Sequence, residues 1–293
     1  MVRLSRAARA VPELRRFAEL AASIIEVERP ASFWELRDAF DELLTPAIWG
    51  AFHNAMLHDL VDAVPLTELP EWHWHGVTVC EAPTFSLMLT SETHSDRGRA
   101  AAPSHADTYI ATTLAAPEML AVLSPHAVVA ERYGMAAGSD IEVFDPFAWL
   151  VPRGTETLQP WRRFDVDAPR EACHLDAGED PLCLLTFAAS SVVWQRWEFE
   201  RGTGRPVQAV QTSNETRAIL VMLAELARAR HVEAVPDVRA LLDHPYFQVR
   251  WEAACCLGAL DAAVAREALH LLAHDRHPHV AAVAADTLRR MNA

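Results

Sequence analysis

Two short polar segments carry residues that could bind a metal ion. His105-Ala106-Asp107 leads into a strand-like run, and Cys173-His174-Leu175 lies shortly before a second run, Leu182 to Phe187. Residues i and i+2 of a strand project to the same face, so His105 and Asp107 can both reach one ion. Two imidazoles and one carboxylate leave coordination positions open, as non-haem Fe(II) oxygenases require. We therefore predict His105, Asp107 and His174 as ligands of a divalent metal, with Fe(II) expected if the chain is an enzyme.

A second histidine pair competes with this set. His73 and His75 alternate with Trp72 and Trp74 on an expected strand, so the imidazoles and the indoles face opposite ways. If the indoles line the core, the imidazoles are solvated; if the imidazoles face inward, they replace His105 and Asp107 as ligands. Because an H-x-D pair also arises by chance among 14 histidines, a metal-free β-sandwich stays open as the alternative.

Composition excludes several other chemistries. The sequence contains no lysine, which excludes a Schiff base and the lysine of a phosphate-binding P-loop. Cys173 and His174 are neighbours in an extended segment and face opposite ways, so they cannot form a nucleophile–base pair. Arg196 and Glu198 alternate with Trp197 and Phe199, the usual pattern of one wet and one dry face, with binding of a substrate carboxylate by Arg196 as the alternative.

The elements that would position these residues fall into three regions. Residues 1–70 are expected to be helical, with a capping box at Ser32 and Glu35 opening the second helix. Residues 71–211 show the period-two alternation of strands, for example over Phe85 to Thr90. Further strands are expected at Ile141 to Phe144, Leu182 to Phe187, Val192 to Phe199 and Val207 to Val210. This middle region is therefore predicted to be an antiparallel β-sandwich or barrel.

The middle region resembles a cupin-like jelly roll, through the His105-Ala106-Asp107 segment and the late Cys173-His174-Leu175 segment. In that family, imidazoles and a carboxylate from facing strands hold a divalent metal inside a small barrel. The resemblance implies that His105, Asp107 and His174 occupy the ligand positions. The fuller family pattern of H-x-H, a following glutamate and fixed glycines is absent, and this departure bears on both metal binding and activity.

Residues 212–293 are expected to be entirely helical, beginning at a capping box of Thr212 and Glu215. A segment beginning at Val249 aligns with one beginning at Val280, an offset of 31 residues, and a His-Pro turn precedes each. Such a period indicates stacked helical units, and the segment from Leu241 to Leu257 resembles HEAT-like repeats. Equivalent faces of the two units are predicted to be buried, through Val249, Ala253, Leu257, Val280, Ala284 and Leu288.

The predicted fold class is thus α+β and multidomain, with N-terminal helices, a cupin-like antiparallel β-sandwich and a C-terminal α-solenoid. A net charge of −14 disfavours nucleic acid and anionic membranes as partners. Five cysteines without a C-x-x-C motif, and no long apolar run, favour a soluble cytoplasmic protein.

Two functions fit these patterns. The first is a metal-dependent oxygenase acting on a peptide or small molecule, with the repeats presenting a protein or peptide partner. The second is a non-catalytic binding or accessory protein whose sandwich and repeats hold a protein partner. Self-association through the repeats, giving a homo-oligomer, is compatible with both.

Overall fold

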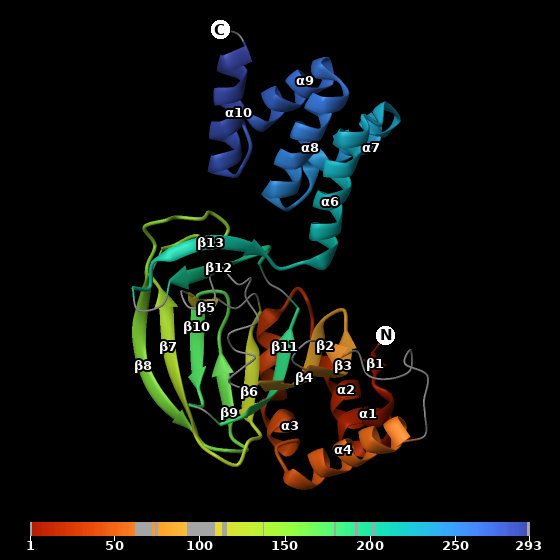
Figure 1. Ribbon diagram of the computed structural model, residues 1–293, viewed down its shortest axis with the longest axis vertical. Helices are drawn as coiled ribbons and strands as arrows, with labels where there is room; N and C mark the ends of the chain where they lie inside the picture. Colours follow the sequence, from red (N-terminus) through yellow and green to blue (C-terminus); the bar gives the residue numbers. More distant parts are fainter. Residues whose placement is uncertain are drawn as a thin grey trace. The chain divides into compact units, whose positions relative to one another are not determined.

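The structure, a computed structural model, describes residues 2–61, 72–73, 76–92, 109–112, 116–136, 138–178, 180–190, 193–200 and 203–291. The chain divides into two compact units, residues 1–210 and 211–293 (Figure 1). The sequence analysis placed this boundary between residues 211 and 212. None of the described helices is long and apolar enough to cross a membrane.

The first unit begins with a short strand and a group of helices. These are β1 (Arg3–Leu4), α1 (Arg6–Ala10), α2 (Pro12–Ile24), the 3-10 helix η1 (Pro30–Leu36), α3 (Arg37–Glu42) and α4 (Pro46–Val61). The expected capping box at Ser32 is wrong, because Pro30 opens a 3-10 helix and Ser32 lies buried inside it. The Ser32 hydroxyl instead accepts a hydrogen bond from the Glu26 backbone N–H at 3.0 Å, and α3 begins only at Arg37.

The strands of the first unit pair antiparallel. They are β2 (Trp72–His73), β3 (Gly76–Ala82), β4 (Phe85–Glu92), β5 (Tyr109–Thr112), β6 (Glu118–Val122), β7 (Val128–Met135), β8 (Leu150–Leu158), β9 (Arg163–Val166), β10 (Glu171–Asp176), β11 (Leu182–Ala189), β12 (Gln195–Glu200) and β13 (Pro206–Gln211). The main sheet has the order β1-β3-β4-β11-β6-β9, with β2 beside β3, and two further sheets have the orders β10-β7-β8 and β13-β12-β5.

Strands β4 to β11 follow the path of a jelly roll. Strands β4, β11, β6 and β9 are neighbours in the main sheet, and β10, β7 and β8 are neighbours in the second. Strand β5 contacts β10 and so continues the second layer. Two four-stranded layers with this order, crossed repeatedly by the chain, are the arrangement of a jelly roll. The expected antiparallel β domain is therefore present.

One face of the main sheet is covered by the N-terminal helices. Phe187 of β11 is fully buried, and its ring lies 4.9 Å from the rings of Phe17 and Phe33. Leu87 and Met119 of the flanking strands β4 and β6 belong to the same core. In Figure 1, the helices gather on the side of this unit where β3 and β4 lie. The N-terminal helices and the sheet therefore share one hydrophobic core.

The expected strand at Ile141 to Phe144 is wrong, because these residues form turns. The Ile141 carbonyl accepts hydrogen bonds from Gln195 Nε2 and Trp197 Nε1, both at 2.8 Å. A carbonyl committed to two side chains cannot join a strand ladder, so tertiary contacts override the local apolar pattern. The segment anchors β12 instead of pairing with a neighbouring strand.

The second unit contains only helices and turns among its described residues from 214 to 291. The helices are α6 (Asn214–Ala229), η3 (Val232–Ala234), α7 (Val235–Ala240), η4 (Leu241–Asp243), α8 (Phe247–Leu260), α9 (Ala262–Leu272) and α10 (Pro278–Met291). The predicted burial of equivalent faces is confirmed at Val249, Ala253 and Leu257 of α8 and at Val280, Ala284 and Leu288 of α10. The first cap is Ser213, whose hydroxyl accepts from Thr216 N, so the expected cap at Thr212 is displaced by one residue.

Candidate functional site

The inner face of the main sheet, opposite the helices, differs in chemistry from the outer face. Thr186 of β11 pairs with Met88 of β4 and Leu120 of β6, and Ala188 pairs with Ser86 and Glu118. Cross-strand partners share a face, so these side chains line the interior of the jelly roll. Apart from Leu120 they are only partly buried, whereas the alternating residues under the helices are buried. The interior is therefore accessible and partly polar.

The second layer closes this interior with β7 and β10. Cys173 and Leu175 of β10 pack on an apolar cluster from both layers, made of Leu120, Val122, Val128, Ala130, Leu158, Phe164, Val166, Ala177 and Leu182. Glu171 lies on the same face of β10 because it is two residues from Cys173. In the register of β10 with β7, Cys173 pairs with Arg132 and Glu171 pairs with Gly134. One end of the interior is thus apolar, and the other end is lined by charged groups.

Glu118, Arg132, Glu171 and Cys173, which we call the inner cluster, lie at this charged end. Burial raises the pKa of the Glu118 carboxyl to about 7, and the attraction of Arg196 opposes that rise. Such a carboxyl exchanges a proton near neutral pH, as a general acid or base does. Glu118 is therefore the residue of the inner cluster best suited to proton transfer.

Arg132 is held in one place by several partners. Its Nη2 donates to Glu171 Oε2 at 2.9 Å and to the Asp165 carbonyl at 3.0 Å. Its Nη1 lies 3.8 Å from Glu156 Oε2, and its guanidinium lies 4.8 Å from the centre of the Phe164 ring. These contacts fix the guanidinium and occupy the two glutamates beside it.

Cys173 is the thiol of the inner cluster. Burial raises the pKa of this thiol to about 12, and the neighbouring Glu118 carboxylate adds to the rise. At neutral pH the sulfur therefore carries its proton, which makes it a poor nucleophile.

His174 faces away from the inner cluster. Ala172, on the same face of β10, packs in a separate cluster with Met135 and Trp197 on the outside of the second layer. In the strand register His174 pairs with Glu131, which accepts a hydrogen bond from the Tyr133 hydroxyl at 2.6 Å. Cys173 thus occupies the inward position that the sequence analysis assigned to His174.

The predicted metal set lies mostly outside the described residues. This holds for His105, Asp107 and His75, while His73 is described only as part of the backbone of β2. The convergence of His105, Asp107 and His174 on one ion therefore stays a prediction. Within the described ranges, no three His, Cys, Asp or Glu side chains are grouped as a metal would need.

The sequence analysis missed Glu118, Arg132 and Glu171 of the inner cluster; it weighed only Cys173, as a nucleophile, and the neighbouring Arg196, as a carboxylate-binding residue. Glu118 follows Pro117 and opens an otherwise apolar strand, which is a detectable signal for a buried carboxylate. Arg132 and Glu171 sit in strands 39 residues apart in sequence. No local spacing could have linked them, because only the fold sets their register.

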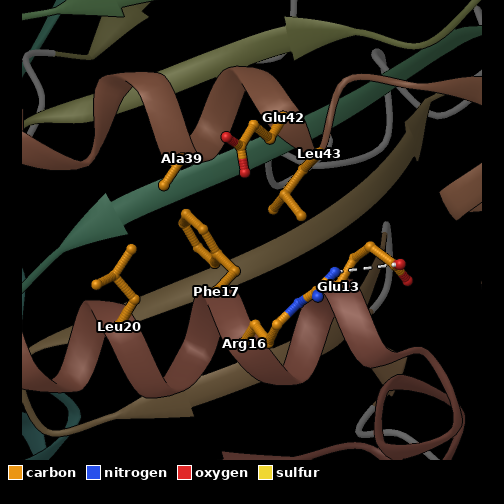
Figure 2. Close-up of a pocket in the computed structure, with 7 residues that line it drawn as sticks. All are labelled: Glu13, Arg16, Phe17, Leu20, Ala39, Glu42 and Leu43. Atoms are coloured by element: carbon orange, nitrogen blue, oxygen red, sulfur yellow. Dashed lines mark hydrogen bonds and ion pairs between the residues drawn. The ribbon is translucent and has the colours of Figure 1, made fainter.

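Two hollows lined by described residues lie away from the inner cluster. The first, of about 350 Å³, lies between α2 and α3 (Figure 2). Phe17, Leu20 and Leu43 point into it, while Glu13 and Arg16 form an exposed ion pair at its edge. The second, of about 260 Å³, lies among α8, α9 and α10, with Trp251 and Leu269 in its lining. Neither combines an enclosed carboxyl and a fixed guanidinium as the interior of the jelly roll does.

No family model matches the chain, and no curated protein matches it. Among solved structures, the DMSP lyase DddQ from Ruegeria pomeroyi aligns over 65% of this chain and 94% of its own, at 11% identity and a TM-score of 0.30. Hydroquinone 1,2-dioxygenase PnpCD, solved with Cd²⁺, aligns over 42% and 68% at 14% identity and a TM-score of 0.29. A cobalt complex of the enzyme HppE aligns over 62% and 97% at 16% identity and a TM-score of 0.25. The jelly-roll assignment rests on the strand order of the two layers.

Proposed function

We propose that the first unit is a cupin-like, metal-dependent enzyme whose reaction takes place inside the jelly roll, with oxygenase chemistry on a small molecule or peptide. The supporting observation is the inner cluster, where the Glu118 carboxyl, with a pKa of about 7, lies near Arg196 and Cys173, and a fixed guanidinium, Arg132, lies near the same Cys173. Accessible barrel interiors that combine apolar walls with a few polar groups are typical ligand sites.

The chain's own residues have definite tasks in this proposal. Glu118 takes up or gives a proton at its carboxyl oxygens near neutral pH. Arg132 is neutralised by Glu171 and serves to keep that wall of the site rigid. The apolar end, with Leu120 and Phe164, excludes water from one side of a bound molecule. A bound Fe(II) with open positions would supply the activation of dioxygen.

The metal donors are the second part of the proposal. His105 and Asp107 precede β5, a strand of the second layer, and are the proposed first donors; the sequence analysis completed the set with His174. Because His174 lies on the outer side of β10, Glu118 and Cys173 are the described inward donors that would complete the set in its place. The described residues alone supply no such group, so the proposal depends on His105 and Asp107.

Metal analysis of the purified protein and of two variants tests both parts. The protein should retain close to one equivalent of iron or another divalent metal. An interior site predicts that Glu118→Gln loses this metal and that His174→Ala keeps it. Loss in His174→Ala alone would restore the ligand set expected from the sequence. Metal-free protein under iron-supplemented expression would refute the enzyme proposal.

A binding or accessory role is the second candidate. It is favoured by the apolar hollow of the second unit, which is lined by Trp251 and by the small residues Ala254, Gly258 and Ala265. HEAT-like stacking of these helices, a protein or peptide partner and a homo-oligomer all belong to this proposal. It predicts no retained metal and no effect of Glu118→Gln on partner binding, whereas Trp251→Ala should weaken that binding.

A further inference from the structure

Two arginines of the jelly-roll interior, Arg153 and Arg196, differ from Arg132 and Arg163 in the partners that they bind. Arg132 and Arg163 each bind carboxylates, at distances between 2.5 and 3.8 Å. Arg153 and Arg196, in contrast, form no hydrogen bond or ion pair with any residue of the described ranges. Both strands that carry them, β8 and β12, flank the charged end of the interior.

The surroundings of Gly134 show where the Arg153 side chain lies. Gly134 pairs with Glu171, so the face that a side chain at position 134 would occupy is the inner face. A Cβ placed on Gly134 would lie 2.6 Å from Arg153 Nε and 3.3 Å from its Cζ. The Arg153 guanidinium therefore lies across Gly134 inside the jelly roll, and the missing side chain makes room for it.

Arg196 reaches the same end from β12. It alternates with Gln195 and Trp197, which are buried on the opposite face. Its charge acts on Glu118, which lies on the inner face of β6. Arg196 therefore faces the interior, where it is exposed.

Three of the carboxylates on the neighbouring strands are already engaged. Glu171 accepts from Arg132 at 2.9 Å, and Glu156 lies 3.8 Å from the same guanidinium. Glu198, on the Arg196 side of β12, accepts from Gln208 Nε2 at 2.6 Å. This leaves two guanidinium groups with unused donors facing the interior. A planar guanidinium binds carboxylate or phosphate oxygens in pairs.

We propose that the molecule held inside the jelly roll carries an anionic oxygen group, a carboxylate or a phosphate, which Arg153 and Arg196 bind. This inference rests on the proposed function, because it names the class of ligand for the same interior. The apolar end with Leu120 and Phe164 then holds the uncharged remainder of the ligand.

Calorimetric titration with pentanoate, pentanamide and inorganic phosphate tests the proposal. Pentanoate or phosphate should bind at least about tenfold more tightly than pentanamide, because charge-assisted hydrogen bonds are the stronger ones. Whichever anion binds better identifies the group. Arg153→Gln should weaken anion binding about tenfold or more and leave pentanamide unchanged.

Two further variants make the test specific. Gly134→Ala should reproduce the loss, because the added methyl group displaces the flexible end of Arg153 without removing its charge. Arg15→Gln removes the same charge from an exposed site on α2 and should leave anion binding unchanged.

The outcomes separate this inference from the proposed function. Pentanamide binding as tightly as both pentanoate and phosphate, equal losses in Arg153→Gln and Arg15→Gln, or no binding of any probe would each overturn the anion site. In all three cases, metal retention and its loss in Glu118→Gln would still decide the proposed function independently.

Discussion

The second unit contains a buried ion pair that joins its two aligned segments. Arg250 of α8 and Asp275, in the turn before α10, are 4% and 5% exposed. Arg250 Nε and Nη2 donate to the two Asp275 carboxylate oxygens at 2.7 and 2.6 Å. Arg250 Nη1 also donates to the carbonyls of His244 and Pro245, and Asp275 accepts from the His277 N–H.

Asp275→Ala should destabilise this unit strongly. The substitution leaves a buried guanidinium with only two carbonyl acceptors, and breaking a buried pair in this way costs about 3–5 kcal/mol. Domains are commonly stable by about 5–15 kcal/mol, so this loss is a large share of the total. The double variant Arg250→Met/Asp275→Leu should be less destabilised than Asp275→Ala, because no buried charge is left unpaired.

Hydrogen exchange of peptides from α8 in the full-length protein measures this effect locally. Asp275→Ala should lower the opening free energy of α8 by about 3 kcal/mol or more. The control is Glu225→Ala, which breaks the exposed Arg228–Glu225 pair of α6 and should change it by under about 1 kcal/mol. Equal, small effects of both variants would refute the reasoning, since burial would then add nothing.

Three further predictions concern pH and packing. Burial alone would raise the pKa of Asp275, but hydrogen bonds from Arg250 and the His277 N–H outweigh it and lower that pKa. The stability that this carboxylate contributes is therefore fully present above about pH 4 and is lost as the pH falls through the lowered pKa. Acid unfolding of Asp275→Asn, compared with that of the unchanged protein, checks this, because the variant should lack this loss. The Glu118 carboxyl gives the opposite pH dependence, because its pKa rises from 4.5 to about 7 in the folded protein. The free energy of unfolding should therefore fall by about 3 kcal/mol as the pH rises from 4.5 to above 7. In denaturant titrations, Glu118→Gln should remove this dependence on pH. Phe187→Ala should destabilise the first unit by about 3–5 kcal/mol in the same titrations, because its ring is fully buried between helices and sheet; a loss below 1 kcal/mol would contradict this packing.

The fold was predictable where one local pattern decides the outcome. Alternation over Phe85 to Thr90 identified β4, and the spacing of Val249, Ala253 and Leu257 identified the buried face of α8. The pattern failed at Ile141 to Phe144, because hydrogen bonds from Gln195 and Trp197 capture the Ile141 carbonyl from 54 and 56 residues away. Sequence spacing carries no information about such contacts.

The candidate site was less predictable than the fold. Adjacent residues on a strand face opposite ways, and the sequence does not say whether Cys173 or His174 faces inward. Only the register of β10 with β7, together with the packing of Cys173 on the apolar cluster, decides this. The sequence also does not show why position 134 is a glycine. The reason is a contact set by the fold, since the Arg153 side chain lies where a Cβ at position 134 would be.

The central claim, that the interior of the jelly roll is the functional site, is tested most directly by methyl NMR of labelled methionines during titration with Mn²⁺. Met88 faces the interior from β4, Met119 lies buried on the opposite face of the same sheet, and Met222 and Met291 are exposed on the second unit. Paramagnetic broadening falls steeply with distance, so the account predicts that the Met88 methyl signal disappears first, at about one equivalent of Mn²⁺. Glu118→Gln should prevent this loss. Earlier broadening of Met222 or Met291, or loss of the Met88 signal unchanged in Glu118→Gln, would contradict the claim.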